Sequence, residues 1–149
     1  GSSSLGEVTE AYANTYFDSL REITLRSVTL DNVIPAGTRV DLIRVDAEGA
    51  EPHVLMGAER VLAENSHAEL ILEVMHEEPE APREPGNRGL WKLIADSGRK
   101  IFTLSKLGGV AEVRSLEAFL ALPHCDVICA PDTPRGAATT STRLFSLFS

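Results

Sequence analysis

Two short apolar runs, separated by a helical pattern, constrain the fold of this chain more than any other feature. The runs are VDLIRV at residues 40–45 and LILEVM at residues 70–75. Both are bounded by turn residues and too short for core helices, which favours strands buried on both faces. Between them, apolar residues recur at helical spacing and predict one amphipathic helix over residues 52–65. A strand, a helix and a second strand in this order predict two parallel neighbours in one sheet.

The rest of the chain continues this alternation of strands and helices. Strand patterns cover residues 23–30 (with a bulge in the middle), 100–104 and 125–130, and helical patterns cover residues 31–37, 89–98 and 116–120. Three prolines place residues 76–86 in a loop. Residues 1–21 are polar and indicate an irregular arm, and residues 132–149 indicate a flexible tail. This order predicts an α/β fold with a mainly parallel sheet.

The charge and the cysteines narrow the range of partners and compartments. The formal net charge is −8. Non-specific binding to nucleic acid or to an anionic membrane needs a basic face, so this charge argues against both kinds of partner. No apolar run approaches the roughly 18 residues of a membrane span. Cys125 and Cys129 would lie about 13 Å apart along one strand, too far for a disulfide. Two free thiols are typical of a reducing compartment, so we expect a cytoplasmic protein.

Acidic residues follow both of the apolar strands. Asp46, Glu48 and Glu51 come after the first strand, and Glu73 lies near the end of the second, with His76 just beyond it. In open α/β sheets, ligands bind beyond the carboxyl ends of the strands. If the two strands are neighbours, these five candidate catalytic residues converge on one edge of the sheet.

Such a cluster has several possible uses. Mutual repulsion raises the pKa of some carboxylates, which suits a general base for a hydroxyl nucleophile. Alternatively, a divalent cation such as Mg²⁺ neutralises the carboxylates, for methyl transfer or for hydrolytic chemistry. A purely structural alternative also exists, because Asp46 or Glu48 could cap the next helix and Glu51 suits its first turn. Glu73 fits that alternative least, since it interrupts an apolar strand.

Four segments, in order, resemble the FkbM family of S-adenosylmethionine-dependent methyltransferases. They are TLD at residues 29–31, DAEGAE at 46–51, VLMGA at 54–58 and LILEV at 70–74. The resemblance covers residues 22–131. It implies a seven-stranded Rossmann-like sheet, mainly parallel, with helices on both faces.

The resemblance also implies a reaction and a set of site residues. The methyl donor would be S-adenosylmethionine, and the acceptor a hydroxyl group of a small molecule or sugar. Asp46 falls where such enzymes bring the acceptor near the reactive methyl, so it is both a catalytic and a cofactor-binding candidate. Glu48, Glu51 and Glu73 match the acids of the family by position.

The chain departs from the family pattern at the cofactor loop. It contains no Asp-x-Gly-x-x-x-Gly segment, so it resembles the C-terminal half of the domain and is expected to be inactive alone. An incomplete sheet leaves an open edge, which predicts self-association or pairing with the missing N-terminal half. The alternative function is a non-enzymatic interaction or assembly module derived from the same fold.

Overall fold

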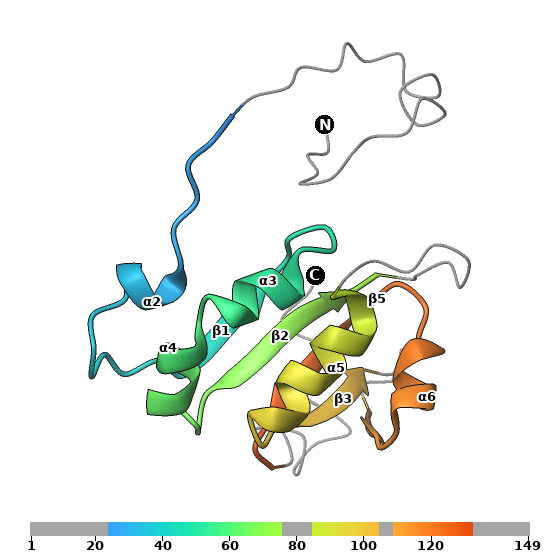
Figure 1. Cartoon of the computed structure of the whole chain (residues 1–149). Helices are drawn as coiled ribbons and strands as arrows, with labels where there is room; N and C mark the ends of the chain where they lie inside the picture. The colour runs from blue at the N-terminus through green and yellow to red at the C-terminus, as the bar shows by residue number, and fades with distance from the viewer. Residues whose placement is uncertain (1–23, 76–84, 105–108, 133–149) are drawn as a thin grey trace, which may run out of the picture.

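The computed structural model describes residues 24–75, 85–104 and 109–132 (Figure 1). His76, the arm at residues 1–21 and nearly all of the 132–149 tail fall outside these ranges, so the predictions for them are not addressed. The elements in chain order are α2 (Leu30–Val33), β1 (Leu42–Val45), α3 (Glu51–Met56), α4 (Glu59–Glu64), β2 (Glu69–Val74), α5 (Gly86–Asp96), β3 (Lys100–Leu104), β4 (Val110–Val113), α6 (Leu116–Leu120) and β5 (Cys125–Ala130).

The five strands form one mixed sheet in the order β1-β2-β5-β3-β4. Among the described strands, β1 and β2 are the only parallel neighbours, as predicted, whereas β5 runs antiparallel to both β2 and β3. The prediction of a mainly parallel sheet was therefore wrong. The cause is β4, which the sequence pattern did not reveal and which pairs antiparallel with β3. Because β4 runs opposite to β3, the connection through α6 brings β5 back in the same direction as β4. The strands β4 and β5 therefore both run opposite to β1, β2 and β3.

The helices of the described residues pack on one face of the sheet. On β2, Leu70, Leu72 and Val74 are fully buried and face this helical layer, while the residues between them are half-buried. The same core includes Leu55 and Leu62 from α3 and α4, and Leu90, Ile94 and Phe119 from α5 and α6. The prediction of helices on both faces is therefore wrong for the part of the chain that is described.

The edge strand β1 differs from the expected strand with two buried faces. Its Leu42 side chain is 54% exposed, whereas Val45 is buried against the helical layer. Within the described ranges, β1 pairs with β2 alone. The apolar run thus correctly predicted a strand. How far the side chains of β1 are buried depends on the elements that pack beside this strand.

The helix predicted over residues 52–65 is interrupted at Gly57, and Asp31 explains the break. The Asp31 N–H donates to the Gly57 carbonyl at 3.0 Å. The Asp31 carboxylate then accepts the backbone N–H groups of Arg60 at 2.9 Å and Val61 at 3.0 Å. Asp31 therefore caps α4 from a distant part of the chain, where Ala58, the residue at the cap position, offers no side-chain acceptor. Residues 24–29 form no strand, so the strand predicted at 23–30 is not found in the described residues; the segment ends in the short helix α2, which carries the cap.

Replacing Asp31 by alanine is expected to lower the midpoint of thermal unfolding by about 2–4 °C, because two N–H groups of α4 lose their acceptor. The same N–H groups, from Arg60 and Val61, lower the pKa of Asp31 below 3.8. A depressed carboxyl pKa stabilises the fold above the ordinary pKa, and this stabilisation is lost as the pH falls through the folded value. Calorimetric scans at pH 7 and pH 3 should therefore show a smaller difference from wild type at pH 3. Asp96→Ala, which removes an exposed acid, is the matched control.

Candidate functional site

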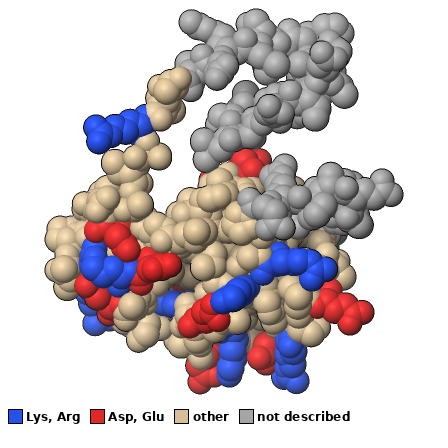
Figure 2. All heavy atoms as spheres, viewed as in Figure 1, with Lys and Arg blue, Asp and Glu red and all other residues tan. Residues whose placement is uncertain are grey.

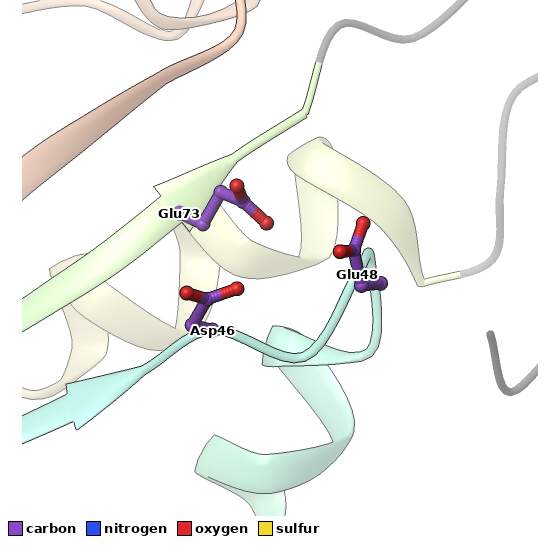
Figure 3. Close-up of side chains that lie close together, drawn as sticks. All are labelled: Asp46, Glu48 and Glu73. Carbon is purple, nitrogen blue, oxygen red and sulfur yellow. The ribbon is translucent and has the colours of Figure 1, made fainter. Parts of the chain in front are cut away.

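Three predicted acids meet at the edge where β1 and β2 end. Val45, the last residue of β1, pairs with Leu72 of β2, so Asp46 follows β1 where Glu73 follows Leu72 on β2. Asp46, Glu48 and Glu73 each place a carboxylate oxygen within 4.8 Å of the others, and Figure 3 shows the three side chains turned toward one another. The predicted convergence of acids from two neighbouring strands therefore occurs for these three residues.

The loop between β1 and α3 presents Glu48 in a strained conformation. Its backbone φ is 51°, and Gly49 follows at 94°. Glycine adopts such values freely, whereas a residue with a Cβ does so at a cost. The cap position of α3 is occupied by Ala50, so neither Asp46 nor Glu48 is the N-cap residue of this helix.

Glu51 holds this loop in place and lies outside the cluster. Its side chain is buried, and its Oε1 accepts the N–H groups of Ala47 at 2.8 Å and Gly49 at 3.2 Å. The residue that was expected in the site thus supports the backbone between Asp46 and Glu48.

This arrangement separates a structural role for Glu51 from a chemical one. Glu51→Ala is expected to lower the free energy of unfolding by about 2–3 kcal/mol, because two loop N–H groups lose a charged acceptor. Glu51→Gln keeps an oxygen at the same place and should lose much less. Urea denaturation of both variants measures the difference. Equal losses for both variants would show that the negative charge, and not the acceptor oxygen, holds the loop.

Two basic side chains face the acids. The Arg44 Nη2 lies 2.9 Å from the Asp46 Oδ2, and the His124 Nε2 lies 2.7 Å from the Glu73 Oε1. The hydrogen bond to Glu73 raises the pKa of His124, burial opposes this, and the nearby charges of Glu48 and Asp126 add to the rise. The other Glu73 oxygen, Oε2, is buried and has no hydrogen-bond partner within the described part of the chain.

Sequence reasoning missed His124 because it assumed parallel strands. His124 immediately precedes β5, and a parallel β5 would have put its start at the opposite edge of the sheet. In the observed antiparallel register, Glu73 pairs with Asp126, which brings the start of β5 beside the end of β2. Recognition of β4 as the second strand of a hairpin would have pointed to His124.

The cluster has the oxygen ligands that a divalent cation prefers. Two of its three acids, however, are already paired with Arg44 and His124. The protein therefore supplies its own hydrogen-bonding partners at these positions, and we assign no metal to them. One groove lies elsewhere: it measures about 340 Å³, is lined partly by Leu55, Leu62 and Leu93, and includes none of the clustered acids.

The face seen in Figure 2 carries charges of both signs, and both cysteines are free. On the face seen in Figure 2, basic and acidic side chains of the described residues are interspersed, and the basic ones form no large patch. Cys125 and Cys129 are both free thiols on the side of the sheet that the helices cover. Among the described helices, none combines the length and apolar character that a membrane span requires.

One comparison with known proteins identifies a relationship. The model of the methyltransferase FkbM domain matches residues 2–106, which is more than half of the chain. No curated protein and no solved structure matches significantly. The matched region contains Asp46, Glu48 and Glu73, and it ends before His124.

Proposed function

Because the chain belongs to the FkbM methyltransferase domain family, we propose that it serves S-adenosylmethionine-dependent methyl transfer to a hydroxyl group of a small molecule or sugar. The observation that supports this most is the convergence of Asp46, Glu48 and Glu73 at the carboxyl edge of the parallel pair. Ligands of open α/β sheets bind at this edge.

The donor set at this edge suits the cofactor chemically. S-Adenosylmethionine carries a sulfonium and an ammonium group, and carboxylates favour both kinds of cation. Asp46 is exposed at the end of β1 and pairs with Arg44, so a cationic group of the cofactor would bind beside Arg44 or take its place. When bound, the cofactor supplies an electrophilic methyl group.

The residues of the chain would act mainly by orientation. Carboxylates accept hydrogen bonds from neighbouring hydroxyls of a polyol, and two or three such bonds fix which hydroxyl faces the methyl group. Holding two reactants in a productive geometry removes much of the entropic cost of their reaction. The left-handed loop at Glu48 supports this role, since strained backbone is concentrated at binding and active sites.

Calorimetric titration with S-adenosylmethionine tests the proposal. The titrations use this chain and the full product of its gene, each as wild type, Asp46→Asn and the control Asp41→Asn. Asp41 lies before β1, away from the clustered end, and pairs with Arg39. We expect binding that weakens about 10-fold in Asp46→Asn and not in Asp41→Asn. Binding that is unaffected by Asp46→Asn would contradict a cofactor role for this carboxylate.

The open edge of β1 favours one other function, that of an assembly module without a cofactor. Among the described residues this strand has one neighbour, and its exposed Leu42 adds apolar surface. Unpaired strand edges invite pairing with another chain. This alternative predicts no binding of S-adenosylmethionine by either protein, together with a dimer in size-exclusion chromatography with light scattering. A monomer at working concentration would contradict it.

We also place the protein in the cytoplasm as part of the proposal. Its two thiols are unpaired, and burial raises the pKa of Cys129 to about 12, which keeps that thiol neutral and unreactive. Unpaired thiols are usual in reducing compartments. Fractionation of cells that express a tagged chain would test this placement.

A further inference from the structure

We propose that His124 is the general base that removes the proton from the acceptor hydroxyl, and that Glu73 is its positioning residue. This inference rests on the proposed function and deepens it, because it assigns the proton transfer to a residue outside the region that the family model matches. Three observations support it: the contact between the two side chains, their exposure, and the position of the acids around the His124 ring.

The contact between the two side chains fixes the roles of the ring nitrogens. The His124 Nε2 lies 2.7 Å from the Glu73 Oε1. When the Glu73 carboxylate is ionised it can only accept a hydrogen bond, so Nε2 is then the nitrogen that carries the proton. In the neutral ring, Nδ1 then has the free lone pair, and no described residue forms a hydrogen bond with it. Catalytic histidines are commonly oriented in this way by a carboxylate on the opposite nitrogen.

The exposure of the two side chains indicates which of them is the base and which is the positioning residue. The His124 side chain is 56% exposed, whereas that of Glu73 is 17% exposed. A hydroxyl arriving from solvent can therefore reach the ring, but it cannot reach the Glu73 Oε2, which is buried. The Glu73 Oε1 is already bound to the ring. Glu73 is thus placed to hold the base and is poorly placed to be the base.

Within the described residues, the acidic groups around the ring come from β2, β5 and the loop after β1. Glu73 lies on β2, Asp126 on β5 and Glu48 on the loop after β1, while Asp46 faces the same cluster and is paired with Arg44. The three acids nearest the ring stabilise its protonated form. A base in this environment is inactive at low pH, gains activity as the pH rises through its raised pKa, and retains a strong affinity for the proton it takes.

The step is balanced within the chemistry of methyl transfer. The hydroxyl oxygen forms a bond to the methyl carbon while the hydroxyl proton moves to Nδ1 of His124. The bond between sulfur and the methyl carbon breaks, and its electron pair stays on sulfur as a neutral thioether. The resulting imidazolium is held by Glu73 and later loses its proton to solvent, which the exposure of the ring permits.

The first test measures the pair without any turnover. In wild type, nitrogen-detected NMR of the histidine rings should show His124 with a pKa above 6.5 and with the proton on Nε2 when neutral. Comparison with His124→Gln assigns the signal. Glu73→Gln should return the pKa toward its ordinary value. An unchanged titration in Glu73→Gln would overturn the positioning role.

The second test measures the reaction, with labelled S-adenosylmethionine and methyl α-glucoside or glycerol as the hydroxyl probe. His124→Gln should lower kcat about 10²- to 10⁴-fold, should remove the acidic limb of the pH profile and should leave cofactor affinity unchanged. His53→Gln, an exposed histidine on α3, is the matched control and should have no effect. If the cofactor binds and kcat is unchanged in His124→Gln, His124 is not the general base. If the cofactor binds wild type but no methyl group reaches either probe, the assignment is also overturned. Absence of cofactor binding would instead contradict the proposed function.

Discussion

Replacing Glu73 by leucine is expected to slow methyl transfer by at least about 10²-fold and, at the same time, to make the fold more stable by about 1 kcal/mol. Glu73 interrupts β2 between the buried residues Leu72 and Val74, and one of its oxygens is buried without a described partner. A leucine of similar volume would remove that desolvated carboxylate. His124 would not be stranded, because its ring is more than half exposed.

Two measurements on the same preparations check this prediction. Urea denaturation gives the free energy of unfolding, and transfer of a labelled methyl group gives the rate. Glu69→Leu, on the same strand and the same face, is the matched control and should leave the rate unchanged. A less stable protein with a near-normal rate would identify Glu73 as a structural acid and contradict its role in the site.

Replacing Phe119 by alanine is expected to lower the free energy of unfolding by about 3–5 kcal/mol. Phe119 is fully buried in the core, and its ring centroid lies 5.5 Å from that of Trp91. It is the only residue of the five-residue helix α6 that is buried, so this ring anchors the helix. The chain then turns directly into His124 and β5.

Urea denaturation with Phe119→Leu as the control separates the ring from general burial. Leucine retains most of the apolar volume and should cost about 1 kcal/mol. A loss below 1 kcal/mol for Phe119→Ala would show that α6 is dispensable for the core. Histidine NMR on the same variant should also show a changed His124 environment, because α6 leads into the turn that carries it.

The sequence predicted the part of the site that depends on local pattern. The apolar runs at 40–45 and 70–75 with a helix between them leave little choice but a parallel pair, and acids at the ends of both must then converge. Asp46, Glu48 and Glu73 follow from this argument. Glu51 does not, because its burial depends on the turn of the loop, which brings the Ala47 and Gly49 N–H groups to its carboxylate.

The parts that were missed depend on contacts between distant residues. β4 is four residues long and half exposed, so its pattern carries little signal, yet it decides the direction of β5 and therefore the position of His124. Asp31 breaks the predicted long helix through bonds to Arg60 and Val61, about thirty positions away in sequence. Neither effect is visible in hydrophobic periodicity, which reports only on neighbours along the chain.

Hydrogen exchange of the full gene product, followed by mass spectrometry with and without S-adenosylmethionine, tests the central claim most directly. If the cofactor binds where the acids converge, exchange should slow in peptides that cover residues 46–51 and 73–75. Peptides from α4 and β4 should be unaffected. Slower exchange at those two elements, with none in the loop that carries Asp46 and Glu48, would place the cofactor elsewhere and contradict the site described here.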